Sequence, residues 1–441
     1  MTALKGLRTL LLEKSRGRSF ARNVAVLAGG TALGQGLAVL ASPLLTRLYT
    51  PSGFGVLAAY TSIFSILLVV VALRYELAIP LPEDDETAGH LLALSLAIVS
   101  GMSLVVGLAV WLLRDHAARW TNAPALESYL WLLPLGLLGM GFYQALNYWA
   151  VRKRAFSRVA QTKLGQSIGM VLTQIGLGLL GLDPAGLLIG DVAGRLSGGG
   201  TLATLTWRLD GTLLKRVNMT GLRRAAARYR RFPLFSSGSG LLNSAGLQLP
   251  ALLLTAFYSP EAAGWFALGQ RAIGTPIALV GQAVAQVYLG EASRLAQENP
   301  QALRGLFLRT ARKLLLVGGA PIAIFALCGP WLFTLVFGEP WYEAGTYVQL
   351  LTLMFVTQFV IVPLSPTLNV LERQDLQLLW DAGRLVLVVG GLVSANALGW
   401  SVSRAVLVYG VAMLIAYGGL FLLCITTIRS LCETPEEQPQ V

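Results

Sequence analysis

A series of long apolar runs constrains this chain more than any other feature of its sequence. Each run has about 20 residues, the length that a helix needs to cross the hydrocarbon core of a bilayer. The chain is 55% hydrophobic and 13% charged, so it has too few polar residues to cover a soluble globule of 441 residues. We therefore expect an all-α polytopic membrane protein with about twelve transmembrane helices. The expected spans are 24–46, 52–73, 88–113, 128–151, 161–181, 184–207, 232–257, 262–288, 311–337, 345–371, 377–399 and 403–428.

The composition argues against several other classes of protein. The net charge is +12, but the basic residues lie between the apolar runs and form no stripe with interleaved aromatics, so nucleic acid is not an expected partner. Cys328, Cys424 and Cys432 are far apart and match neither a disulfide framework nor a metal spacing. His90 and His116 have no Cys or second His nearby. We expect no metal site and no cofactor.

The positions of Lys and Arg predict the orientation of the spans, because these residues accumulate in cytoplasmic loops. With the N-terminus inside, 27 of the 34 Lys and Arg residues fall in cytoplasmic segments and four in external ones. Both termini are then cytoplasmic. The acidic run at 83–86 falls on the same side and does not fit this simple picture, although acids contribute little to orientation.

A short repeat divides the chain into two halves. The segment LLTRLYTPSGFG at 44–55 returns as LLTAFYSPEAAG at 253–264, a spacing of 209 residues. Each copy follows the first span of its half with the same orientation, so the repeat is parallel and predicts a pseudo-two-fold axis along the membrane normal. We expect two six-helix lobes around a central cavity. The predicted segments are a basic N-terminus at 1–23, an N-lobe at 24–207, a basic cytoplasmic linker at 208–231, a C-lobe at 232–428 and a tail at 429–441.

Polar residues inside two of the spans share one spacing, at offsets of 0, 4, 11 and 15 residues. On a regular helix these offsets fall on one face, and such a face predicts a cavity wall. Hydrogen bonds between helices are the alternative interpretation of each stripe. The first span carries Thr31, Gln35, Ser42 and Thr46, and the eighth span carries Arg271, Thr275, Gln282 and Gln286.

Arginines inside spans are a sharper signal, because a charge at the bilayer centre costs at least about 2.5–3.5 kcal/mol. Arg195 follows Asp191 by four residues, so this arginine either pairs with Asp191 within the helix or contacts substrate. Arg384 follows Asp381 by three residues near the inner end of its span, which favours an interfacial ion pair. Arg271 has no acid three or four residues away on either side. It is the best candidate for binding an anion.

Other candidate site residues lie near the ends of spans. Arg47, within the first copy of the repeat at the outer end of the first span, either contacts substrate or extends to the outer interface. Arg74, at the inner end of the second span, has the same two interpretations. Gln144 and Asn147 in the fourth span are candidates for hydrogen bonds to sugar. Trp149 could stack on a sugar ring or belong to the aromatic belt at the membrane interface.

Two segments near the N-terminus resemble a known family. The sequences SPLLTRLYTPSGFGVLAAYTSIF at 42–64 and LRYELAIPLPEDDETAGHLLALS at 73–95 are similar to those of Wzx-like O-antigen and exopolysaccharide flippases. These belong to the multidrug/oligosaccharidyl-lipid/polysaccharide exporter superfamily. The resemblance implies two six-helix bundles around a cavity that opens alternately to each side of the bacterial inner membrane. It also implies an undecaprenyl-pyrophosphate-linked oligosaccharide as cargo. The family provides no fixed substrate residues to transfer to this chain.

A mechanism follows from the resemblance together with the residues. Arginines in the cavity, namely Arg271, Arg195, Arg47 and Arg74, would bind the pyrophosphate, since guanidinium groups bind phosphate in a bidentate manner. The polyprenyl tail would stay in lipid. Net flux needs a cargo gradient or a coupled ion, and Asp191 or Asp381 could bind H⁺ or Na⁺. A polysaccharide polymerase and a chain-length regulator are the expected protein partners.

Three alternative functions stay open at this point. A lipid II flippase of the same superfamily would share the fold and the positive cavity. A multidrug antiporter would also share the fold, but cationic drugs favour acids in the cavity, whereas the deep unpaired charge here is an arginine. A membrane polysaccharide polymerase or ligase would need catalytic groups on an external loop. The longest such loop, near 114–127, shows no evident nucleophile or base pair.

Overall fold

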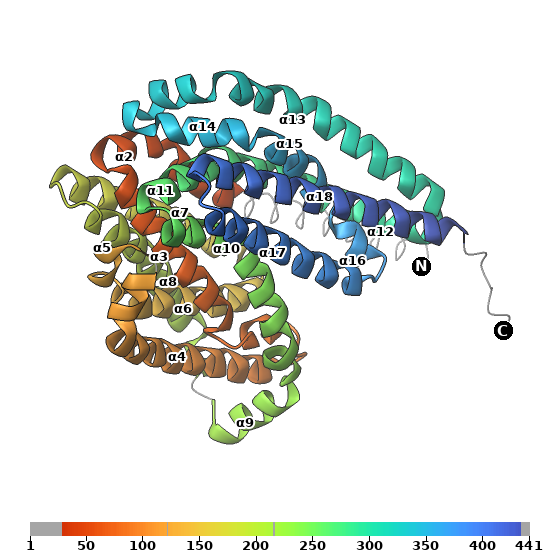
Figure 1. The fold of residues 1–441 in the computed structure, drawn as a ribbon. Coiled ribbons are helices and arrows are strands. Elements are labelled where there is room, and N and C mark those ends of the chain that lie inside the picture. The colour runs from red at the N-terminus through yellow and green to blue at the C-terminus, as the bar shows by residue number, and fades with distance from the viewer. Residues whose placement is uncertain (1–28, 121, 215–216, 434–441) are drawn as a thin grey trace.

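The computed structural model describes residues 29–120, 122–214 and 217–433. Within these ranges the chain is helical, with turns between the helices and no strand. Figure 1 shows the helices of the second half, in green, teal and blue, gathered on one side of the red-to-yellow helices of the first half. The predicted all-α polytopic fold with two lobes is confirmed, and the comparisons given below support the same fold.

The first half begins with a helical segment at 29–40. It is followed by α2 (Ser42–Leu48), α3 (Pro51–Val70), the short helix η1 (Tyr75–Ala78), α4 (Asp85–Trp120), α5 (Pro124–Glu127), α6 (Leu132–Arg152), α7 (Phe156–Leu179) and α8 (Ala185–Leu214). The helix α9 (Met219–Arg228) lies between the two halves.

The second half contains the π-helical turn η2 (Phe232–Ser236), α10 (Ser237–Phe257), α11 (Pro260–Gly269), the π-helical turn η3 (Gln270–Gly274) and α12 (Thr275–Glu298). It continues with α13 (Pro300–Phe337), η4 (Glu339–Trp341), α14 (Tyr342–Leu350), α15 (Thr352–Ile361), η5 (Val362–Leu364), α16 (Pro366–Val370), α17 (Gln374–Ala397) and α18 (Val402–Glu433).

Eight helices of the described residues are long and apolar enough to cross a membrane. They correspond to the predicted second, third and seventh to twelfth spans. The other four predicted spans coincide with 29–48, α6, α7 and α8, which are helical but more polar, or in the first case interrupted. All four belong to the first half, whose more polar helices also carry many of the cavity residues described below.

The two copies of the repeated segment lie against each other at one end of the helical bundle, here named the motif end. Each copy begins a helix in the same way: Thr50 and Ser259 cap the helix N-terminus, and a proline follows directly. A Cβ atom built on Gly55 would lie 1.7 Å from the carbonyl oxygen of Pro260, and one on Gly264 would lie 1.9 Å from that of Pro51. The two glycines therefore let α3 and α11 touch about the pseudo-two-fold axis.

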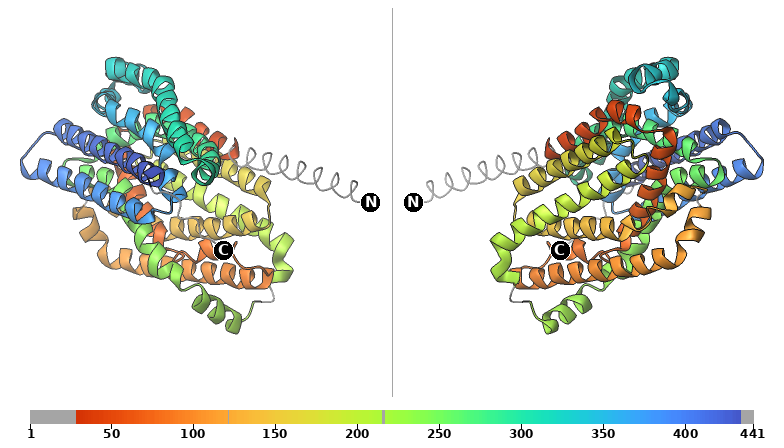
Figure 2. Two further views of the ribbon diagram at one scale, coloured as in Figure 1. Left: turned by 90° about the vertical axis from the view of Figure 1, so that its right-hand side faces the viewer. Right: turned by 90° about the vertical axis from the view of Figure 1, so that its left-hand side faces the viewer.

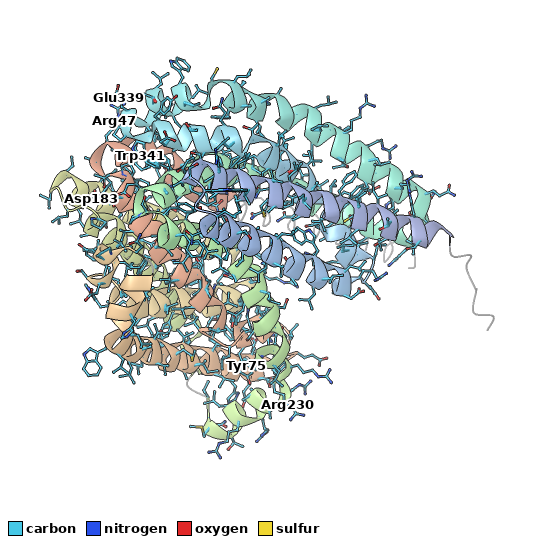
Figure 3. All side chains as sticks on the ribbon, in the orientation of Figure 1. Arg47, Tyr75, Asp183, Arg230, Glu339 and Trp341 are labelled. Carbon is cyan, nitrogen blue, oxygen red and sulfur yellow. The ribbon has the colours of Figure 1, made fainter. Side chains whose placement is uncertain are left out.

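Further contacts close the motif end between the halves. The indole Nε1 of Trp341 donates a hydrogen bond to the backbone oxygen of Thr46, at 3.1 Å. The Phe54 ring packs edge-on against the Trp341 ring at 4.9 Å between centroids. Figure 3 shows Arg47, Asp183, Glu339 and Trp341 at this end, with Tyr75 and Arg230 toward the opposite end. We call the opposite end, which carries α9, the linker end.

The acidic run at 83–86 has a structural explanation at the linker end. Asp85 accepts a hydrogen bond from Nε of Arg152 at 2.9 Å and also pairs with Lys153. Arg152 further donates to the backbone oxygens of Pro82 and Glu83. The acid at the start of α4 is therefore paired with the basic end of α6, which accounts for its place among basic loops.

Several predicted boundaries fall differently in the structure. α8 continues to Leu214 and α9 begins at Met219, so part of the predicted linker 208–231 is helical. α18 continues to Glu433, and the first residues of the predicted tail are therefore helical as well. The predicted N-terminal segment 1–23 and residues 434–441 lie outside the described residues. Figure 2 shows the two groups of helices from two further sides.

Candidate functional site

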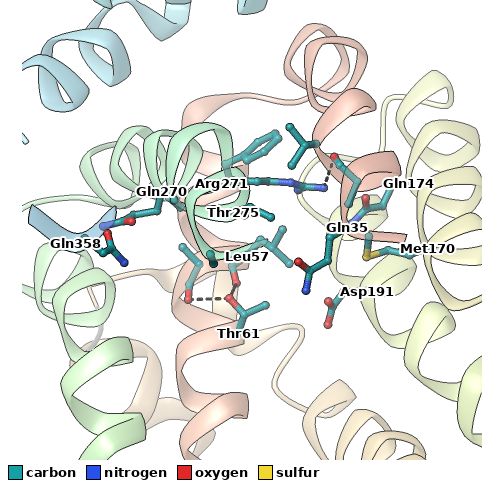
Figure 4. A pocket seen from close by; sticks show the side chains of 17 residues that line it. Gln35, Leu57, Thr61, Met170, Gln174, Asp191, Gln270, Arg271, Thr275 and Gln358 are labelled. Carbon is teal, nitrogen blue, oxygen red and sulfur yellow. Dashed lines mark hydrogen bonds between the residues drawn. The ribbon is translucent and has the colours of Figure 1, made fainter. Parts of the chain in front are cut away.

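A cavity of about 540 Å³ lies between the two halves. Segment 29–40, α3, α7 and α8 line it from one side, and α11, η3, α12 and α15 line it from the other. Figure 4 shows its polar side chains gathered from both halves. They are Gln35, Thr61, Gln174, Asp191, Gln270, Arg271, Thr275 and Gln358.

Arg271 reaches across the cavity from the second half to the first. It belongs to the π-helical turn η3, and its Nη2 donates a hydrogen bond to the backbone oxygen of Ala38 at 2.8 Å (Figure 4). The first helix is interrupted at Ala41, three residues after Ala38, and the Ala38 oxygen also accepts a hydrogen bond from the Ser42 hydroxyl at 3.0 Å. Within the described residues Arg271 has no ion-pair partner. A guanidinium that contacts one carbonyl keeps most of its five donors available for an anion.

Asp191 and Arg195 lie on adjacent turns of α8 and form a two-pronged ion pair. Nε of Arg195 is 2.6 Å from Oδ2 of Asp191, and Nη2 is 3.0 Å from Oδ1. The Arg195 guanidinium also lies 3.7 Å from the centroid of the Phe64 ring. Asp191 faces the central cavity, and it also lines, together with Arg195, a neighbouring cavity of about 180 Å³. Arg195 is therefore behind the wall of the central cavity and connected to it through Asp191.

This ion pair supports a stability prediction. The side chains of Arg195 and Asp191 are only 19% and 12% exposed. Replacing Asp191 by Asn leaves a buried guanidinium without its carboxylate, which costs about 3–5 kcal/mol. We expect a clear drop in the thermal unfolding midpoint of the purified protein. The exposed pair Arg373–Asp375 is the matched control: Asp375→Asn leaves the midpoint unchanged. Equal midpoints for the two variants would contradict the structural role of Asp191.

Only two of the four residues in the predicted stripe on the eighth span line the central cavity. Arg271 and Thr275 line the cavity, whereas Gln282 and Gln286 are exposed further along α12 and do not. The prediction assumed one regular helix, but η3 is a π-helical turn, which adds about one residue and rotates the following face. The expectation that all four residues form one wall is wrong.

The stripe on the first span is also divided. Gln35 lines the cavity, whereas Thr31 accepts a hydrogen bond from Nζ of Lys163 on α7, at 2.9 Å. Ser42 and Thr46 are buried and donate to backbone oxygens three or four residues earlier. The interruption of the helix at residue 41 separates the two pairs, so the four residues form no common wall.

Arg47 and Arg74 lie apart from the cavity. Arg47 is exposed at the motif end, and Arg74 lies in a left-handed turn at the linker end of α3. Nη1 of Arg74 is 4.0 Å from Oε1 of the buried Glu76. Burial raises the pKa of the Glu76 carboxyl, and Arg74 offsets part of this effect. A Cβ on Gly240 would lie 2.1 Å from Nη2 of Arg74, so this arginine packs directly on α10 of the other half.

The polar residues of α6 lie within the first half. Gln144 and Asn147 are half-buried and line none of the described cavities. Trp149 is fully buried, and its Nε1 donates to Oδ2 of Asp210 on α8 at 3.1 Å. This indole therefore packs in the protein core. It neither faces a cavity where sugar could bind nor lies on the surface with the interfacial aromatic belt.

Asp381 and Arg384 form an ion pair on α17 at 3.0 Å, away from the central cavity. Nη2 of Arg384 also donates to Oδ1 of Asn243 on α10, and the guanidinium lies 4.7 Å from the centroid of the Trp380 ring. Arg384 is 5% exposed. The Arg384 guanidinium is thus buried where α10 meets α17, and it also lines a separate cavity of about 440 Å³.

Five cavity or near-cavity residues were not selected from the sequence. Thr61, Gln270 and Gln358 are polar residues inside predicted spans, but none belongs to a stripe. Gln174 is 1% exposed, and its Nε2 donates to the backbone oxygen of Leu187. The charge distribution predicts that Lys163 is cytoplasmic, but α7 begins seven residues before it, so Lys163 lies inside that helix. A search for every amide inside a span would have found the three glutamines.

Comparisons with known proteins agree with this architecture. The chain is 24% identical over 382 residues to the succinoglycan biosynthesis transport protein ExoT of Rhizobium meliloti (strain 1021), covering 84% of this chain and 73% of that protein. It is 26% identical over 156 residues to the teichuronic acid biosynthesis protein TuaB of Bacillus subtilis (strain 168), covering 35% of this chain and 32% of that protein.

Solved structures show the same fold. An inward-facing MATE family multidrug resistance transporter of the MOP superfamily matches with a TM-score of 0.71 at 16% identity, covering 93% of this chain and 96% of that one. The lipid II flippase MurJ, in an inward closed conformation, matches with a TM-score of 0.67 at 9% identity and covers 93% of each chain. At these identities the likeness concerns the fold alone.

A family described as polysaccharide biosynthesis proteins matches residues 44–346, which is more than half of the chain. The matched region includes both copies of the repeated segment and most residues that line the central cavity, among them Asp191 and Arg271, but not Gln35, Ala38, Val39 or Gln358. The resemblance inferred from the N-terminal segments is thereby confirmed. The chain is a multi-pass membrane protein and belongs to the polysaccharide biosynthesis protein family.

Proposed function

We propose that this protein is a flippase that moves an undecaprenyl-pyrophosphate-linked oligosaccharide from the inner to the outer leaflet of the bacterial inner membrane. The observation that carries this proposal is Arg271, which extends into a cavity between the two halves and forms no ion pair among the described residues, although Asp191 lines the same cavity. The family and the transporter named succinoglycan biosynthesis transport protein support a role in moving polysaccharide precursors.

The chemistry of the cavity fits the polar part of such a cargo. Gln35, Gln270 and Gln358 supply amide donors and acceptors of the kind that sugar hydroxyls use. Arg271 supplies a planar set of donors for the pyrophosphate. The polyprenyl tail would remain in the lipid while the two halves rock about the pseudo-two-fold axis. In this cycle the contact between Gly55 and Gly264 closes the motif end and must separate before release.

The orientation of the cycle follows from the charge bias of the sequence. We assign the linker end, with α9 and its arginines, to the cytoplasm and the motif end to the outside, which places both termini in the cytoplasm. The cargo would enter from the linker end and leave at the motif end. Of the two candidate coupling carboxylates, Asp191 lines the cavity and Asp381 does not, so Asp191 is the better candidate for binding H⁺ or Na⁺.

Two related functions compete with this proposal. The structural match to lipid II flippase MurJ keeps lipid II as an alternative cargo with the same pyrophosphate and polyprenyl chemistry. The match to a multidrug transporter keeps cationic drugs as another. Asp191 offers a cationic drug a carboxylate, but Arg195 already neutralises it and Arg271 adds positive charge. This balance favours an anionic cargo.

Deletion of the gene in its host tests the proposal. We expect surface polysaccharide to be lost and its lipid-linked precursor to accumulate on the cytoplasmic face, where a membrane-impermeant reagent reaches it only after the cells are opened. A plasmid-borne wild-type copy restores export. Normal surface polysaccharide in the deletion strain, with either increased drug sensitivity or trapped lipid II, would contradict the proposed cargo.

A further inference from the structure

A second cavity, of about 630 Å³, lies within the first half at the linker end and takes no part in the proposed transport cycle. Its volume falls within the range of roughly 300–1,000 Å³ that is typical of ligand pockets. It lies among α4, α6 and α8, and residue 217 of the connection to α9 closes one side. The lining is Ala93, Leu96, Phe142, Leu146, Ala203, Thr204, Thr206, Trp207, Arg208 and Val217.

The cavity lies in the part of α4, α6 and α8 that is nearer the linker end. Phe142 is ten residues from the linker end of α6, which ends at Arg152, and ten residues of helix rise about 15 Å. Half the thickness of a hydrocarbon core of about 30 Å is the same distance. Along α8 the lining runs from Ala203 to Arg208, a rise of about 7.5 Å, so the cavity lies within the half-thickness that adjoins the linker end.

The polar rim of the cavity is positively charged. Arg208 is exposed and has no ion pair among the described residues, because the nearby Asp210 is engaged by Trp149 and Arg158. The Trp207 side chain beside it is 62% exposed, which suits an indole at the boundary between hydrocarbon and headgroups.

Residues 217 and 218, just before α9, are held in place over this rim. The backbone N of Asn218 donates to Nε2 of His90 on α4 at 3.2 Å, which fixes the preceding Val217 against the cavity. The hydroxyl of Tyr75 donates to the backbone oxygen of Ala226. Basic side chains that are exposed on or just after α9 add to the charge of this surface, namely Arg223, Arg224, Arg228, Arg230 and Arg231.

We propose that this cavity binds an anionic phospholipid of the adjacent leaflet, with an acyl chain among α4, α6 and α8 and the phosphate on Arg208. A largely apolar cavity with an arginine that forms no ion pair among the described residues at its mouth matches the acyl chain and the phosphate of such a molecule. Lys and Arg at a membrane surface attract anionic lipids, and each contributes to the preference. The bound lipid would fix the position of α9, and thus of the connection between the halves.

Quenching of Trp207 by brominated lipid tests this proposal on the purified full-length protein. The fluorescence of the Trp207→Phe variant is subtracted from that of the wild type, which leaves the fluorescence of Trp207 alone. We expect phosphatidylglycerol with brominated acyl chains to quench it at a lower mole fraction than brominated phosphatidylcholine. Arg208→Gln should raise the half-quenching concentration of phosphatidylglycerol about fivefold. Arg230→Gln, an exposed arginine that does not line the cavity, should leave it unchanged.

A second variant separates a bound lipid from lipids that merely surround the protein. Ala203→Phe fills the cavity and should abolish the preference for phosphatidylglycerol, whereas Ala227→Phe on the exposed face of α9 should not. Equal quenching by both lipids, or quenching unaffected by Arg208→Gln and Ala203→Phe, would overturn the proposal. Displacement of the brominated lipid by low concentrations of polyprenyl diphosphate would also overturn it, because the cavity would then hold a cargo tail.

Discussion

Alanine in place of Arg271 will reduce export of surface polysaccharide to a small fraction of the wild-type level while the protein still inserts into the membrane normally. The guanidinium is the cation that lines the central cavity, and it forms no ion pair among the described residues. Hydrogen bonds to charged groups contribute roughly 1.5–3 kcal/mol, so losing the contact lowers transport by about 10–100-fold. Complementation of the deletion strain, with quantified surface glycan and a membrane blot, measures this effect.

Two further variants separate charge from geometry at this position. Arg271→Lys keeps the charge but loses the planar fork, so we expect intermediate export. Arg47→Ala is the control, because Arg47 is also an arginine of the predicted set but is exposed at the motif end and does not line the cavity. It should export normally. Normal export by Arg271→Ala would remove this residue from the site.

Valine in place of Gly264 will stop transport by preventing closure of the motif end. The added Cβ would lie 1.9 Å from the carbonyl oxygen of Pro51, which is backbone and has no other rotamer to adopt. The same clash arises at Gly55, whose Cβ would lie 1.7 Å from the Pro260 oxygen. Both substitutions should therefore hold the two halves apart at this end, and both should reduce transport to background.

Labelling from outside the cell distinguishes this effect from misfolding. In a variant without native cysteines, a cysteine at position 35 reports access to the cavity. We expect Gly264→Val to increase its reaction with an impermeant maleimide. Gly290→Val is the matched control, since nothing lies within 4 Å of a Cβ at that position. Wild-type transport by Gly264→Val would show that the two glycines do not form a gate.

The general architecture could be predicted because it depends on local patterns. Runs of apolar residues gave the positions of the helices, and the repeated segment gave the turns at 50–51 and 259–260. What the repeat could not reveal is that its two copies touch. That contact joins residues 209 positions apart and depends on the absence of side chains at Gly55 and Gly264. A glycine signals close approach, but it does not identify the partner.

The site was harder to predict because both stripes assumed regular helices. Pro43 follows an interruption of the first helix at residue 41, and η3 widens the eighth span at Arg271 itself. These irregularities move Ser42, Thr46, Gln282 and Gln286 away from the cavity. The backbone oxygen of Ala38, just before the interruption, accepts hydrogen bonds from both the Ser42 hydroxyl and Arg271. The interruption at residue 41 and the π-helical turn η3 therefore both invalidate the predicted stripes and shape the polar cavity.

Ion pairs within one helix were easier to foresee than contacts between helices. The spacings of Asp191 with Arg195 and of Asp381 with Arg384 indicated pairs, and the structure contains both. The burial of Trp149, by contrast, depends on Asp210 on another helix. Asp85 likewise has partners almost 70 residues away. Such long-range pairs follow from the fold and cannot be read from spacing in a single sequence.

Transbilayer movement in proteoliposomes tests the central claim most directly. The purified protein is reconstituted with a fluorescent undecaprenyl-pyrophosphate-linked oligosaccharide, and a membrane-impermeant reagent that destroys the exposed fluorophore measures how much cargo changes leaflet. The account predicts rapid loss of the protected fraction with wild type and slow loss with Arg271→Ala. It also predicts little movement of lipid II or of a cationic drug. Equal protection with wild type, Arg271→Ala and empty liposomes would contradict it, as would movement of lipid II alone.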